Sequence, residues 1–167
     1  YGALGHAVTD ADTGERLLVK SGEIIRASII GVALGEQGAP GEIRGTFNVL
    51  SKRLGNIENN TVYGVFGTLY EPLPNPLYPE GVQLAYPDEL EEGPAQILTS
   101  VDAEGVKAYD CEIIKLYAQD AADTKGMVIR VTDPELIEKT GGIVQGMSGT
   151  PILQDGRLIK TESWQGR

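Results

Sequence analysis

Short apolar runs alternate with turn residues along most of this 167-residue chain. The runs contain many β-branched residues, and Gly, Pro, Asp and Asn separate them at short intervals, which is typical of β-strands joined by turns. The pattern predicts strands at 16–20, 23–34, 42–49, 62–69, 82–85, 95–101, 106–117, 127–132, 150–154 and 157–159. Many short strands and few helical patterns indicate an all-β fold, either a sandwich or a barrel.

The length of the chain fits a single domain over residues 1–167, built from two small β-barrel halves. The proline-rich stretch 71–79 is extended, and we expect it to connect the two halves. The strongest hairpin signal lies at 150–159. There Asp155 and Gly156 separate two apolar runs, and an Asp-Gly pair suits a two-residue type I′ turn.

One short helix is predicted over residues 132–141. Asp133 can cap its N-terminus, and Pro134 suits the first helical position because its missing N–H is not needed there. Gly141 can adopt the left-handed conformation that ends many helices. We expect this helix to pack through Leu136 and Ile137.

Composition narrows the possible chemistry. The 24 acidic and 14 basic residues give a net charge of −10, which argues against binding to a nucleic-acid backbone. A single cysteine, Cys111, excludes an internal disulfide framework and a cysteine-based zinc site, and a single histidine, His6, excludes a multi-histidine metal centre. Cys111 lies in the predicted strand 106–117, where a buried structural thiol is expected rather than a nucleophile.

The segment GGIVQGMSGTPI at 141–152 is the most informative part of the sequence. Gly146 and Gly149 flank Ser148, so the backbone can form a tight turn that exposes the serine hydroxyl. The backbone amides of Gly146, Met147 and Ser148 could then form an oxyanion hole. An ordinary Gly/Ser turn before a strand is the alternative, and the segment alone does not distinguish the two.

His6 supplies the second part of the hypothesis. A lone histidine is more often an ordinary surface or core residue. A serine hydroxyl is a poor nucleophile without an adjacent base, however, and His6 is the only imidazole in the chain. The order, with His6 early and Ser148 late, matches that of chymotrypsin-like serine peptidases. Together the two segments favour a serine peptidase.

Five blocks of the sequence resemble the peptidase domain of the stage IV sporulation protein B family. They are GALGHAVTD at 2–10, FGTLY at 66–70, GPAQILT at 93–99, KGMVIRVTDP at 125–134 and GGIVQGMSGTPI at 141–152. The resemblance extends from residue 2 to about residue 159 and so covers nearly the whole chain. It implies a secreted serine endopeptidase with a chymotrypsin-like double β-barrel that needs neither a metal nor a cofactor.

The resemblance also implies a biological setting. Members of this family act in endospore-forming bacteria, after secretion across the forespore membrane into the space between forespore and mother cell. The expected protein substrate is an inhibitory membrane-protein subunit, whose cleavage lets an intramembrane protease process the precursor of a late sigma factor. Self-cleavage is expected as well, and nucleic acid is not an expected partner.

The resemblance assigns the third member of a catalytic triad to Asp133, in the Thr-Asp-Pro motif before Ser148. A role as helix N-cap is a strong alternative, and one carboxylate could serve both roles, with one oxygen on a backbone amide and the other on His6. The weaker candidates for the acid are Asp10, Asp12, Asp88 and Asp110.

The sequence departs from the family at both ends. We expect this chain to lack the membrane anchor and PDZ domain that precede the family's peptidase domain, so membrane association is expected only through such an upstream anchor. After 157–159 the family continues into a further barrel segment, whereas this chain reads KTESWQGR at 160–167. The C-terminal part is therefore expected to be incomplete. The alternative functions are a non-catalytic β-barrel binding module and an inactive, truncated peptidase domain.

Overall fold

The computed structural model describes all of the chain except residues 1, 5, 11, 37, 118–125 and 162–167. It confirms an all-β architecture, since strands in three antiparallel sheets dominate the described residues. The strands are β1 (Gly2–Leu4), β2 (Glu23–Ile24), β3 (Ala27–Ala33), β4 (Glu42–Phe47), β5 (Gly55–Thr61), β6 (Gly64–Leu69), β7 (Gly93–Thr99), β8 (Lys107–Leu116), β9 (Met127–Val131), β10 (Pro151–Gln154) and β11 (Arg157–Thr161). The described helices are the 3-10 turn η1 (Pro87–Glu89) and α1 (Pro134–Thr140).

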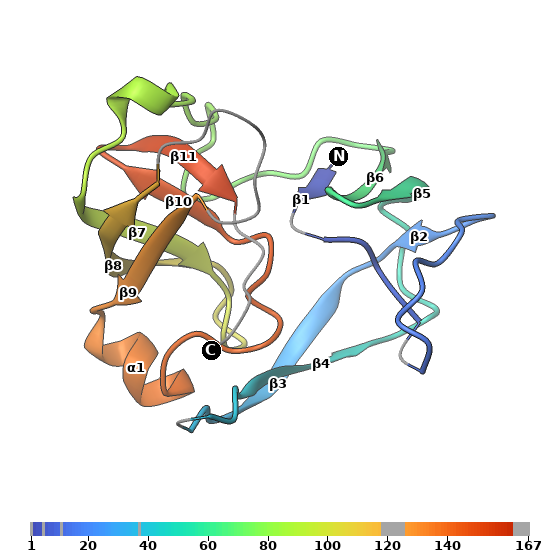
Figure 1. The fold of residues 1–167 in the computed structure, drawn as a ribbon. Coiled ribbons are helices and arrows are strands. Elements are labelled where there is room, and N and C mark those ends of the chain that lie inside the picture. Colours follow the sequence, from blue (N-terminus) through green and yellow to red (C-terminus); the bar gives the residue numbers. More distant parts are fainter. Residues whose placement is uncertain (1, 5, 11, 37, 118–125, 162–167) are drawn as a thin grey trace.

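The second half of the chain forms a five-stranded sheet in the order β11-β10-β7-β8-β9 (Figure 1). Side chains alternate between its two faces, as the period of a strand requires. Ile97 of β7, Cys111 and Ile113 of β8 and Ile152 of β10 are buried together on one face, and partly buried residues of β9 and β11 cover them. This cluster is one of two apolar cores of the described residues, and its burial on one face favours a single register of the sheet.

The first half of the chain is more open. It forms a four-stranded sheet in the order β1-β6-β5-β2 and a separate two-stranded hairpin of β3 and β4, which extends beneath the other sheets toward α1 (Figure 1). Several large apolar side chains of this half are exposed, among them Leu18, Val49 and Leu50. Within the described residues, none of the three sheets closes on itself.

Helix α1 confirms most of the prediction for 132–141. The Asp133 carboxylate accepts a hydrogen bond from the Leu136 N–H at 3.0 Å, and Pro134 is the first helical residue. Gly141 ends the helix with φ 73°, in the left-handed region. The packing prediction was correct for Leu136, which is fully buried, but wrong for Ile137, whose exposed fraction is 44%. A helix of two turns can direct only a narrow face toward the core.

The predicted hairpin at 150–159 is also confirmed. β10 and β11 pair in antiparallel orientation across Asp155 and Gly156. Both turn residues have positive φ, 51° and 74°, as a type I′ turn requires. The local signal was sufficient here because the turn chemistry selects the hairpin geometry without help from the rest of the fold.

Two strand predictions were wrong, and strand β5 was not predicted. The segments predicted at 16–20 and 82–85 contribute only isolated bridges, through Arg16 and Leu84. β5 was not predicted, because Gly55–Thr61 carries mostly polar side chains. It is a strand because β6 provides a long antiparallel partner for its backbone.

No helix in the described part of the chain has the length and hydropathy to cross a membrane. The connection of two halves by 71–79 stays a prediction.

A network of ion pairs attaches α1 to the loop between β7 and β8. Lys139 of the helix lies 2.6 Å from both Asp102 and Glu135, while Lys107 lies 3.1 Å from Glu135 and 2.5 Å from Glu104. The hydrogen bond from Lys139 lowers the pKa of the Asp102 carboxyl, and hydrogen bonds from Lys139 and then Lys107 lower that of Glu135. Folding therefore favours the charged form of both acids.

This network predicts a pH-dependent contribution to stability. A carboxyl group whose folded pKa is lowered stabilises the fold above its unfolded pKa of about 4, and this stabilisation is lost as the pH falls through the folded value. We expect Lys139→Met to lower the urea midpoint at pH 7 and to differ less from wild type at pH 3. Lys52→Met, which removes an exposed pair with Glu71, is the control and should change little at either pH. An equal loss for Lys139→Met at both pH values would contradict this account.

Candidate active site

Ser148 lies in the turn that connects α1 to β10, and its side chain is partly buried. Gly146, two residues earlier, has φ 99°, a backbone conformation that residues other than glycine rarely adopt. The N–H of Met147 donates to the carbonyl oxygen of Val144 at 3.2 Å, and Thr150 N–H donates to the Met147 carbonyl at 3.1 Å. The glycine-rich segment therefore forms a tight turn around the serine, as the sequence predicts.

The Met147 side chain anchors this turn in the core. It is fully buried with Tyr109, Leu136 and Val144, in a second apolar cluster next to the helix. Its sulfur also accepts a hydrogen bond from the Val144 N–H at 3.4 Å. Because Met147 points inward, the residues on either side of it are held at the surface of the domain, and Ser148 is one of them.

Two amides of the turn have no acceptor in the part of the chain that the structure describes. Among the described residues, the N–H groups of Gly146 and Ser148 donate to no protein atom, and the Ser148 hydroxyl has no hydrogen-bond partner. Met147 differs, because its N–H already donates to the Val144 carbonyl oxygen. The oxyanion hole expected from the amides of Gly146, Met147 and Ser148 stays a prediction. Two unengaged amides on either side of a buried residue, beside a free hydroxyl, suit the stabilisation of an oxyanion.

The β3–β4 hairpin holds the segment that leads to Ser148. Gln145 forms a parallel bridge with β4, in which its N–H donates to Gly41 and its carbonyl accepts from Ile43. The Gly35 N–H donates to the last carbonyl of α1, that of Thr140, at 2.9 Å. These partners could not be predicted from the sequence, because no local pattern in residues 35–43 indicates contact with a segment so far along the chain.

His6 follows β1 and is exposed. Its ring Nδ1 lies 2.8 Å from the carbonyl oxygen of the next residue, Ala7. A carbonyl oxygen can only accept, so this contact requires the proton on Nδ1 and leaves Nε2 as the acceptor. That tautomer is the one a general base needs. In this structure a backbone carbonyl, and not a carboxylate, selects it.

Asp133 directs both carboxylate oxygens to backbone amides. Oδ1 accepts from the Leu136 N–H at 3.0 Å, and Oδ2 accepts from the Asp110 N–H at 3.3 Å. The helix-cap role is therefore confirmed. In the described part of the chain, no hydrogen bond joins any two of His6, Asp133 and Ser148. The assignment of these three residues to a triad stays a prediction.

Two of the weaker candidates for the triad acid, Asp10 and Asp110, have other hydrogen-bond partners as well. The Asp10 carboxylate accepts bonds from Thr13 and Asp12 in its own turn, and the Thr13 backbone bond is the main reason that its pKa is lowered. Asp110 accepts a bond from the Gln96 side chain at 3.0 Å. Asp88 lies exposed in η1. No described hydrogen bond links these groups to the imidazole.

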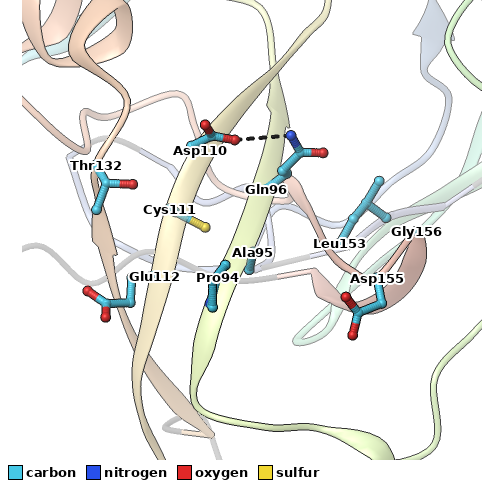
Figure 2. A pocket seen from close by; sticks show the side chains of 10 residues that line it. All are labelled: Pro94, Ala95, Gln96, Asp110, Cys111, Glu112, Thr132, Leu153, Asp155 and Gly156. Carbon is cyan, nitrogen blue, oxygen red and sulfur yellow. Dashed lines mark hydrogen bonds between the residues drawn. The ribbon is translucent and has the colours of Figure 1, made fainter.

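A pocket of about 530 Å³ lies on the solvent-facing side of β7 and β8, beside the β10–β11 turn (Figure 2). Asp110, Glu112 and Asp155 make its wall acidic, and none of the three predicted catalytic residues lines it. Cys111 contributes to the wall but is buried, and desolvation raises its pKa to about 12. This confirms a structural thiol, since a nucleophile needs an accessible thiolate.

Comparison with known proteins gives one match. A family model, SpoIVB peptidase S55, matches residues 1–162, which is nearly the whole chain. No curated protein and no solved structure matches it. The matched segment contains the glycine-rich turn, the imidazole and the capped helix described above.

Substitutions at Asp133 separate its two roles. Asparagine caps a helix about as well as aspartate, so Asp133→Asn should lose less stability than Asp133→Ala, which should cost about 0.5–2 kcal/mol. As the triad acid, Asp133→Asn should also lower turnover by orders of magnitude, because an amide favours the wrong imidazole tautomer. Turnover measured beside a melting curve tests both. A stable and fully active Asp133→Asn protein would leave Asp133 as a helix cap alone.

Proposed function

Because this chain belongs to the SpoIVB peptidase S55 family and is therefore a serine peptidase, we propose that it is a sporulation-signalling endopeptidase with Ser148 as its nucleophile. The observation that carries the proposal is the turn itself. Its serine hydroxyl and two backbone amides, those of Gly146 and Ser148, are without partners in the described part of the chain. Gly146 is exposed and Ser148 is partly buried, so a substrate carbonyl oxygen could approach both amides and serve as their acceptor.

In the proposed reaction, the Ser148 hydroxyl attacks the carbonyl carbon of a substrate peptide bond while His6 Nε2 takes its proton. The negative charge that develops on the carbonyl oxygen faces the N–H groups of Gly146 and Ser148. His6 then gives the proton to the leaving amine, which departs, and an acyl-enzyme remains. Water attacks this ester with His6 again as base, and the acid product and the free Ser148 hydroxyl are regenerated.

Asp133 completes the proposed triad as the group that would orient the imidazole. In this structure the Ala7 carbonyl occupies His6 Nδ1, and two amides occupy Asp133. Each carboxylate oxygen has two lone pairs, so Asp133 can accept an additional hydrogen bond from His6. The proposed triad therefore requires His6 to exchange its Ala7 contact for one with the carboxylate.

The substrates that we propose are proteins. Membership of a SpoIVB family supports a role in sporulation. On this basis we propose cleavage of an inhibitory membrane-protein subunit that controls processing of a late sigma-factor precursor, together with self-cleavage. The proposed location is the space between forespore and mother cell, and the proposed mechanism needs neither a metal nor a cofactor.

One observation favours a second candidate function. No described hydrogen bond connects His6, Asp133 and Ser148 with one another; His6 and Asp133 bond to backbone groups instead. A non-catalytic β-domain that binds partner proteins would not need hydrogen bonds between these three residues. The two candidates differ in one measurable property, because only the peptidase needs an activated serine.

A fluorophosphonate probe tests that property. We expect stoichiometric labelling of the wild-type chain at Ser148 and none of Ser148→Ala, because phosphonylation requires an activated hydroxyl. Ser28→Ala removes an exposed serine of β3 and is the control, with labelling unchanged. Intact mass and peptide mapping give the stoichiometry and the site. An unlabelled wild-type chain with a normal melting curve would favour the binding module.

A second experiment tests the base. His6→Ala should reduce the rate of labelling and of peptide cleavage by at least about 10²-fold, the lower range for general base catalysis. The melting temperature should stay near that of wild type, since the His6 ring is exposed and, among the described residues, bonds only to its neighbour Ala7. Added imidazole should restore part of the rate. Normal turnover of His6→Ala would exclude His6 as the base.

A further inference from the structure

Gln145 lies beside β4 like one residue of an additional parallel strand. Its N–H donates to the Gly41 carbonyl at 2.8 Å, and its own carbonyl accepts from the Ile43 N–H at 2.9 Å. Together these two hydrogen bonds form a parallel β-bridge between Gln145 and Glu42. The peptide groups on both sides of Gln145 are therefore held by the hairpin of the first half of the chain.

The second of these hydrogen bonds sets the direction of the Gly146 N–H. The peptide group between Gln145 and Gly146 is planar, and in a trans peptide the C=O and the N–H point in opposite directions. With the Gln145 oxygen turned toward Ile43, the Gly146 N–H must point away from the hairpin. This N–H is one of the two amides that find no acceptor in the described residues.

Gly146 needs such a restraint more than another residue would. Without a Cβ it can adopt many backbone conformations, including its φ of 99°, so its own sterics do not select one orientation for the peptide. Ile43 also lies against it, since a Cβ added at Gly146 would be 3.1 Å from the Ile43 Cβ. Ile43 in turn packs with Val144 and Met147 in the second apolar cluster.

We propose that Ile43 is a positioning residue of the peptidase reaction. Its backbone N–H holds the Gln145–Gly146 peptide in the orientation that directs the Gly146 N–H toward the oxyanion. The inference rests on the proposed function of Ser148, and Ile43 acts only through this peptide group. Donation to the Gln145 oxygen also polarises the peptide, which strengthens the Gly146 N–H as a donor.

An ester bond at position 43 tests the proposal most directly. Replacing Ile43 with its α-hydroxy acid analogue changes the backbone N–H to an oxygen and keeps the side chain. The ester chain should have a kcat about 10- to 100-fold below wild type with a nearly unchanged KM, because the loss concerns the transition state. The inhibition constant of a peptide boronic acid, whose adduct places an oxygen in the oxyanion hole, should rise by a similar factor.

The same ester replacement at Arg44 is the matched control. Successive N–H groups of a strand point to opposite sides, so the Arg44 N–H faces β3 and not Gln145. This control loses a hairpin hydrogen bond but keeps the contact with Gln145, and its kcat should stay near wild type. Rates are calculated per active site titrated with fluorophosphonate.

The outcomes separate this proposal from the proposed function. A wild-type chain that neither reacts with fluorophosphonate nor cleaves peptides overturns both. An active wild-type chain and an Ile43 ester with unchanged kcat and boronate affinity overturn the positioning role alone. If the ester chain does not fold, NMR of the unmodified chain tests the proposal. On boronate binding, the amide protons of Gly146 and Ile43 should both shift downfield. A shift of neither proton, or of only one, overturns the proposal.

Discussion

The pairing of Gln145 with the first residues of β4 is the contact on which the candidate active site depends. The segment from Gly141 to Thr150 forms no helix or strand of its own, apart from this bridge, and is rich in glycine. A chain of this kind has a large conformational entropy, so its orientation must be imposed from outside. Backbone hydrogen bonds to the hairpin fix one side of the segment, and burial of Met147 fixes the other.

This dependence explains why the open first half of the protein matters for function. Its loops and its β3–β4 hairpin leave many apolar side chains exposed, and the buried apolar residues belong to the second half. Yet Val32 and Ile43 of the hairpin pack on the cluster that contains Val144 and Met147. In the loop that connects β3 and β4, Gly41 approaches Gly35 so closely that a Cβ added at Gly41 would lie 2.5 Å from the Gly35 nitrogen. Close backbone approach of this kind gives the contact little freedom to shift.

Local chemistry also decides the state of the two side chains that would assist the serine. The Ala7 carbonyl selects the His6 tautomer with a free Nε2, and the helix end and the Asp110 amide occupy Asp133. A cap and a triad acid require the same property, a fixed carboxylate that accepts hydrogen bonds. The same residue can therefore satisfy both patterns, which is why neither sequence nor local geometry alone separates the two roles.

The sequence by itself determined the features that depend on neighbouring residues: the all-β class, the capped helix before Gly141, the Asp155–Gly156 turn and the glycine-flanked serine. It also located the buried Cys111, because a thiol inside an apolar strand has few other environments. It failed for the polar β5, which is a strand because β6 and β2 pair with its two edges, and it could not show which segment would hold Gln145. Turns and caps are closed by bonds within a few residues, whereas strand pairing and the orientation of a glycine-rich loop depend on partners far along the chain. Only the tertiary structure brings those partners together.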